Sequence, residues 1–132
     1  MFNNSGITKT TGYNTTQILF DVQNQKSVSV VVAAANKSEG EAVNGHTILR
    51  AGTPLTGDLT ARTTGFTKGG DATTVGVLMH DVDLGPVGSE KDANGSLLIW
   101  GFVNLDRVSA KANGLLTTNI KDGLKGRIWF LK

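Results

Sequence analysis

The sequence contains no cysteine, and only 18% of its 132 residues are charged. Without cysteine there are no disulfides and no thiolate metal sites, so the chain gives no indication of its redox compartment. The longest apolar run, Val28 to Ala35, contains Ser29 and is too short to cross a bilayer. The first residues show no basic region followed by an apolar stretch, so we expect no signal peptide. We expect a soluble protein made and used inside the cell.

Glycine, by contrast, is abundant, with 17 residues against 2 prolines, and 39% of the chain is hydrophobic. This composition is typical of a globular domain with many tight turns. A chain of 132 residues predicts a single domain, one that buries about two-thirds of its unfolded surface. The small charged fraction leaves a surface of Ser, Thr, Asn and backbone groups, and such surfaces often lie against another protein.

The net charge is +2, and the excess lies near the C-terminus, where five basic residues face only Asp122: Lys111, Lys121, Lys125, Arg127 and Lys132. Nucleic-acid binders usually carry denser basic clusters with aromatic residues among them. Here only Trp129 and Phe130 accompany the charges. The pattern favours a solvated face, or one that meets an acidic partner, over nucleic-acid binding.

The stretch from Val75 to Val82 is the centre around which the chain is organised. It is apolar and partly β-branched, and turn residues bound it on both sides, which predicts a strand buried over most of its length. Gly76 inside it leaves a gap on the pleat, which indicates a bulge or a second backbone passing close by.

The other segments predict a mainly β fold, a small compact barrel or sandwich with one short C-terminal helix. Pro54 makes Gly52-Thr53-Pro54 a turn or sheet margin rather than part of a central strand. Polar loops are expected at 36–45 and 85–95, each ending in an Asn-Gly pair that is typical of tight turns. Further strands are expected at 26–35, 46–51, 96–104 and 127–131, with a weaker one at 59–66, a short helical turn at 108–113 and a helix at 115–123.

Residues 1–24 differ from the body at 25–132. They are rich in Asn, Thr and Gln, and Lys9 is their only charge before Asp21. One interpretation is a frayed terminus. The other is an extended arm that becomes ordered by adding a strand to the sheet of another chain, because Thr-rich, nearly uncharged sequence pairs edge to edge with little repulsion.

Residues that could carry chemistry are few. Asp81 and Asp83 alternate along a strand end, so they could hold a cation or form half of an acid pair, or could be solvated turn residues. His46 and His80 could meet as metal ligands or act as a base, although no spacing motif links them. The sequence has no Gly-x-Ser-x-Gly elbow and no Walker lysine. We therefore expect no enzyme activity, no metal and no cofactor.

The order of three motifs resembles the lambda-type bacteriophage head decoration, or capsid cement, proteins. The motifs are Ala51-Gly52-Thr53-Pro54-Leu55, then Val75-Gly76-Val77-Leu78, then Gly101-Phe102-Val103-Asn104-Leu105. The resemblance spans roughly residues 46–131, and the loops at 36–45 and 85–95 match no part of the family pattern.

The resemblance implies a small β-tulip-like fold that forms a homotrimer and caps three-fold or quasi-three-fold sites on the expanded capsid. It also implies a place on the outer surface of the virion and an N-terminal arm that pairs with strands of the major capsid protein, with no role for nucleic acid or membrane. The capsid-binding side chains would then be the apolar and threonine residues of the arm: Ile7, Thr8, Thr10, Tyr13, Thr15, Thr16, Ile18 and Phe20.

Two other functions remain open. One is another β-structured virion module, such as a fibre or receptor-binding domain, and the other is a small-ligand barrel or enzyme. An exposed aromatic cluster would favour the fibre or receptor-binding module. Trp100 and Trp129 are instead expected to lie in core strands.

Overall fold

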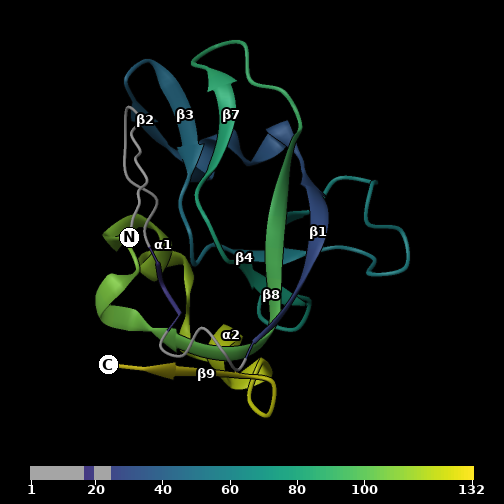
Figure 1. Ribbon diagram of the computed structural model, residues 1–132, viewed down its shortest axis with the longest axis vertical. Coiled ribbons are helices and arrows are strands. Elements are labelled where there is room, and N and C mark those ends of the chain that lie inside the picture. Colours follow the sequence, from purple (N-terminus) through teal and green to yellow (C-terminus); the bar gives the residue numbers. More distant parts are fainter. Residues whose placement is uncertain (1–16, 20–24) are drawn as a thin grey trace, which may run out of the picture.

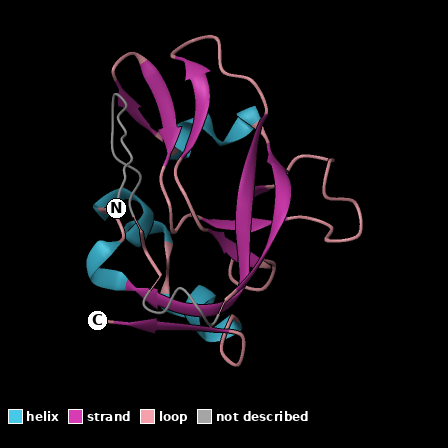
Figure 2. Cartoon of the chain, viewed as in Figure 1, coloured by secondary structure: helices cyan, strands magenta, loops and turns pink. Residues whose placement is uncertain are grey.

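The computed structural model describes residues 17–19 and 25–132, and over these residues the chain is mainly β (Figures 1 and 2). The strands form two sheets, which do not close into a barrel and are compatible with a small sandwich-like fold. The elements in chain order are β1 (Lys26–Val32), η1 (Ala34–Glu39), β2 (Glu41–Val43), β3 (His46–Leu49), β4 (Pro54–Thr56), β5 (Thr67–Lys68), β6 (Gly76–Leu78), β7 (Val82–Pro86), β8 (Ala93–Asn104), η2 (Leu105–Arg107), α1 (Ala110–Leu115), α2 (Thr118–Gly123) and β9 (Ile128–Leu131).

The larger sheet is built on β8, whose 12 residues make it the longest strand described. The strand order is β1-β8-β6-β4-β5, and β9 pairs with β8 in parallel. The smaller sheet has the order β2-β3-β7, and its hairpin turn is Asn44-Gly45, with φ of 52° and 80°. This confirms the first of the two Asn-Gly turns.

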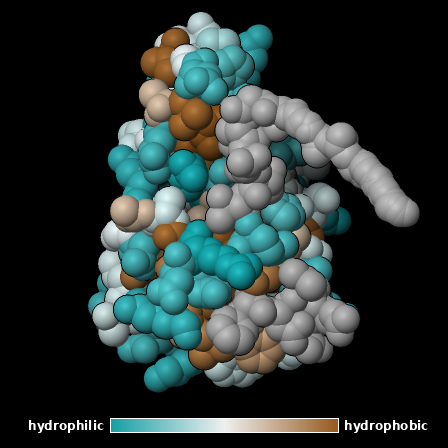
Figure 3. Space-filling model, turned by 60° about the vertical axis from the view of Figure 1, so that its left-hand side comes forward, coloured by the Kyte–Doolittle hydropathy of each residue, from teal (hydrophilic) through white to brown (hydrophobic). Residues whose placement is uncertain are grey.

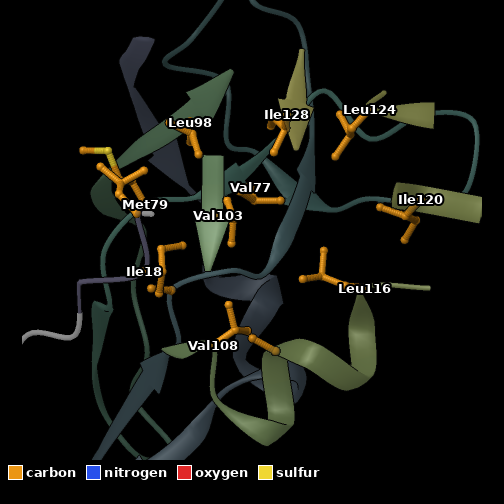
Figure 4. Close-up of a cluster of buried hydrophobic side chains, with 13 residues drawn as sticks. Ile18, Val77, Met79, Leu98, Val103, Val108, Leu116, Ile120, Leu124 and Ile128 are labelled. Carbon is orange, nitrogen blue, oxygen red and sulfur yellow. The ribbon is translucent and has the colours of Figure 1, made fainter. Parts of the chain in front are cut away.

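Two clusters of buried side chains lie on opposite faces of the β6–β8 pair. Val77 and Leu98, which are paired, belong to one cluster, and their chain neighbours Leu78 and Leu97 belong to the other. Successive side chains of a strand point to opposite faces, so this part of the sheet is buried on both sides. The first cluster is closed by α1, α2 and β9, and Figure 4 shows Ile18, Val103, Val108 and Leu116 converging in it.

The expected central strand, Val75 to Val82, is present only in part. It divides into β6 in the larger sheet and β7 in the smaller one, with a bend between them. At this bend an Asp81 carboxylate oxygen accepts the backbone N–H of Ala51 at 2.7 Å, which ties the crossing point to the end of β3. The inference from Gly76 is confirmed, because a Cβ there would lie 2.3 Å from the backbone oxygen of Leu98.

Four further expectations are corrected. The 59–66 segment forms turns with a single bridge, Phe66 to Val32, because the Asp58 carboxylate accepts the N–H and hydroxyl of Thr60 and starts a turn there. The 36–45 loop contains the end of η1 and all of β2. The second Asn-Gly, Asn94-Gly95, lies inside β8 opposite β1 instead of closing a loop. The expected helix at 115–123 is present but starts later, at Thr118, because Leu115 ends α1 and the Thr117 hydroxyl accepts the N–H of Ile120 to begin α2.

Pro54 is also placed differently from expectation, because it begins β4 inside the larger sheet. The turn precedes it at Gly52, whose φ is 99°, and the Thr53 hydroxyl donates to the Arg50 carbonyl at 2.7 Å. Pro54 lacks an N–H, but its carbonyl accepts the N–H of Gly69 at 2.9 Å. The strand on that side, β5, has only 2 residues and pairs with the following positions of β4, so no ladder donor is lost.

The close approach at Gly76 yields the first prediction. Gly76→Ala should lower the free energy of unfolding by roughly 1–3 kcal/mol, because the new methyl group must displace the backbone of β8. The matched control is Gly114→Ala in α1, where a Cβ meets nothing within 4 Å. This change should raise stability by about 0.5–1 kcal/mol, since alanine is the better helix former. Urea unfolding measures both, and equal effects would contradict the packing at Gly76.

Candidate interaction surfaces

Three aromatic side chains form a partly exposed cluster on the part of the sheet where β8 pairs with β9. The rings of Phe102 and Trp129 stack with centroids 5.2 Å apart, and Trp100 meets both edge to face at 6.1 and 5.9 Å. Trp100 and Trp129 are 36% and 37% exposed. The expectation that these tryptophans lie in the core is therefore wrong, and we call these three residues the aromatic face.

A register shift explains why these rings point outward. Ser27 pairs with Leu98 and Lys26 with Trp100, so Ile99 is an extra residue in β8. An extra residue reverses which face the following side chains occupy. Leu98 contributes to the core before the shift and Val103 after it, while Trp100 and Phe102 turn to the opposite face, where Trp100 is exposed and Phe102 is half-buried. The pattern of apolar residues alone gives no sign of this shift.

The described part of the N-terminal segment lies against β8 of the same chain. Leu19 forms an antiparallel bridge with Val103, and the Asn104 N–H donates to the Ile18 carbonyl at 2.8 Å. Ile18 and Leu19 are buried, with exposed fractions of 0% and 4%. Ile18 was assigned to the capsid-binding arm, and this is corrected, because a side chain within its own core cannot contact a partner. The other assigned residues lie outside the described part: Ile7, Thr8, Thr10, Tyr13, Thr15, Thr16 and Phe20.

Asp81 and Asp83 do not form a shared site. The Asp81 side chain is 2% exposed and lies 3.4 Å from Arg50 Nε, so it belongs to the junction between the two sheets. Asp83 lies on β7 at the surface, where both carboxylate oxygens are within 3.1 Å of His46 Nδ1. Each aspartate has its own basic neighbour, and the geometry gives neither a cation site nor a carboxylate pair.

The two histidines are likewise used separately. His46 is exposed and bound to Asp83, whereas His80 Nδ1 is buried and has no hydrogen-bond partner among the described residues. Among the residues described, no group of three or more His, Cys, Asp or Glu side chains is placed to hold a metal ion. Within the same part of the chain, no helix has the length and apolar character needed to span a membrane.

The surface hollows are shallow and scattered. One of about 400 Å³ runs beside β1 and the 60–63 loop, where Arg62 Nη1 donates to the Ser29 carbonyl at 2.7 Å. Another, of about 230 Å³, lies along β9. On the side of the molecule shown in Figure 3, apolar residues form several separate patches among polar ones. Both hollows are open to solvent rather than enclosed.

Comparisons with known proteins assign no family to this chain. No protein-family model matches the sequence, and no curated protein matches it significantly.

Glu90 gives a measurable probe of the smaller sheet. Its carboxylate accepts the Thr47 hydroxyl at 2.6 Å, and this bond lowers the pKa of Glu90 below its ordinary value. Because the folded-state pKa is depressed, the interaction stabilises the fold above the unfolded-state pKa, and the stabilisation is lost as pH falls through the folded-state pKa.

We predict that Thr47→Val raises the pKa of Glu90 toward its ordinary value, since the largest cause of the shift is removed. Carboxyl chemical shifts followed by NMR during an acid titration measure this. The control is Thr60→Val, which should instead raise the pKa of Asp58, whose main stabilising bond comes from Thr60. A Glu90 titration that is the same in both variants would contradict the assignment.

Proposed function

We propose that this chain is a head decoration protein of a lambda-type bacteriophage. It binds the expanded capsid as a homotrimer at three-fold or quasi-three-fold sites and stabilises the shell. The observation that carries the proposal is the arrangement of the three family-like motifs. The first motif runs from a turn into β4, the second forms β6, and the third is the end of β8. All three strands belong to the larger sheet, where β6 pairs with β4 and with β8 at Leu97 and Leu98.

The N-terminal arm is the proposed attachment device. Residues 1–16 carry one charge, Lys9, and are rich in threonine, so they suit strand addition to the major capsid protein. The burial of Ile18 and Leu19 against β8 supports this proposal, because it fixes the N-terminal segment to the body directly after residues 1–16. We therefore place the attachment residues of the arm before Gln17, a narrower range than 1–24. We call Ile18 and Leu19 the N-terminal anchor.

Linkage supplies the mechanism. A ligand that binds only the mature lattice stabilises that lattice by RT ln(1 + [L]/Kd) per site. Ordering each arm residue costs roughly 1–2 kcal/mol of backbone entropy, so strand pairing and apolar contacts must exceed that cost. Three arms on one trimer act at high effective concentration, which lets modest single contacts give firm attachment.

The aromatic face supports a second candidate, a fibre or receptor-binding module of the virion. Trp100 and Trp129 are both exposed there, and aromatic residues are enriched at protein interfaces. Trp129→Ala separates the two candidates. Loss of cell-surface binding with shell binding retained would favour the second candidate.

Selectivity for the expanded lattice tests the decoration function. Purified protein mixed with expanded shells and with unexpanded precursors should co-sediment with the expanded shells alone, since only they present the mature sites. Expanded shells carrying the protein should also resist higher temperature or lower salt than bare ones. Equal binding to both particles would remove the link to maturation.

The arm itself is tested by truncation. Removing residues 1–16 should abolish shell attachment while leaving the unfolding midpoint and the light-scattering mass of a trimer unchanged. Ile18→Ala in the full chain is the contrasting variant. It should lower stability by about 2–5 kcal/mol, because it opens a cavity in the core. Truncated protein that still binds shells would end the arm hypothesis.

A further inference from the structure

A groove of about 230 Å³ follows the outer edge of β9 and is bounded on its other side by α2 and the turn after it. All four β9 residues border it, together with Leu105, Lys121, Asp122 and Lys125. The strand lies at the rim of the molecule in Figure 1, with α2 beside it. Because consecutive residues of one strand border the groove, it runs along the backbone edge rather than over one face.

Within the described part of the chain, β9 has a strand neighbour on one side only, which is β8. The Gly101 N–H donates to the Arg127 carbonyl at 2.9 Å, and alternate residues of a strand point to the same edge, so Trp129 and Leu131 also face β8. The backbone N–H and C=O groups of Ile128 and Phe130 therefore point away from β8, toward the groove. The N–H of Ile128 is used by the Leu124 carbonyl at 2.9 Å, but the described residues offer no backbone partner to Phe130 there.

The side chains around this edge combine an apolar floor with a basic rim. Leu105 and Phe130 are half-buried and pack on the core, while Leu131 is 37% exposed. Lys121 and Lys125 stand on the opposite wall. Asp122 is the one acidic lining residue described, and its contact with Lys125, at 3.7 Å between exposed groups, neutralises that wall only in part.

We propose that this groove binds an extended acidic segment of a partner protein, which adds a strand to β9. The partner segment exchanges backbone hydrogen bonds with Phe130, inserts apolar side chains over Leu105 and Phe130, and directs carboxylates to Lys121 and Lys125. Charge complementarity selects this occupant. Residues 1–16 of a second copy carry only Lys9 and no acidic residue, so they do not match the basic rim.

A small molecule fits this groove less well. Pockets for such ligands usually exceed about 300 Å³ and enclose most of the ligand, whereas this groove is smaller and open along one side. The inference does not depend on the decoration function, because it uses only the edge of β9 and the charges around it. On a virion, the partner would be a shell protein that presents an acidic strand.

The probe is a short fluorescein-labelled peptide that alternates glutamate and valine. It should bind the full chain in a fluorescence anisotropy titration, and its affinity should fall as salt is raised. Amide exchange followed by NMR should show the Phe130 N–H becoming protected on binding. The Trp129 N–H, which already faces β8, should change little.

Matched variants locate the site. Lys121→Glu with Lys125→Glu should weaken the peptide about tenfold or more, as expected for charges that contact a bound partner. Lys68→Glu with Lys91→Glu makes the same change of net charge at exposed positions outside the groove lining, and should have little effect. A peptide with lysine in place of glutamate, or with alternate amides methylated, should lose binding.

Each contrary result overturns the proposal. Absence of binding at millimolar peptide would do so, as would equal weakening in the two double variants or tolerance of amide methylation. Protection confined to residues other than Phe130 would assign the contact to another surface. A failure of shell binding in the experiments above leaves these results unaffected, so the two proposals are judged separately.

Discussion

The strand β8 is the element on which the rest of the structure depends, because other segments pair with both of its edges and core clusters pack on both of its faces at Leu97 and Leu98. One edge carries β1 and, beyond it, the bridge to Leu19, and the other carries β6 and then β9. Leu97 and Leu98 contribute to core clusters on opposite faces, and each is fully buried. Burying a leucine side chain stabilises the fold by about 1.5–3 kcal/mol. Because these two leucines are adjacent and belong to different clusters, they join the two halves of the core.

Much of the fold follows from local sequence. Gly76 indicated a close backbone, and Asn44-Gly45 indicated a hairpin, because each depends on a property of glycine that acts within a few residues. Asn94-Gly95 carries the same local signal as Asn44-Gly45, yet it is held extended inside β8 opposite Val30 and Val31. Tertiary pairing overrides turn preference there, and no local reading distinguishes the two cases.

The candidate surfaces are harder to derive from sequence, for a related reason. The run from Leu97 to Val103 is almost continuously apolar, so it has no alternation that separates inside from outside. Leu97 and Leu98 are apolar because the sheet is buried on both faces there. From Trp100 to Val103 one face of the strand packs on the core and the other carries the aromatic face. The extra residue at Ile99 separates these two parts of the strand. Only the pairing with β1 reveals it.

The excess of basic residues near the C-terminus was visible in the sequence, but its meaning depends on where β9 lies. Lys121 lies in the last turn of the short helix α2, and Lys125 comes just after it. The chain returns to the core at Leu124, and β9 then pairs in parallel with β8. Parallel pairing at the end of the chain leaves the far edge of β9 beside those lysines. The N-terminal anchor occupies the other edge of β8. The larger sheet thus carries its own N-terminal segment at one margin of β8. In the proposal made above, the partner strand adds at the opposite margin, along β9, so it does not disturb the core between the two margins.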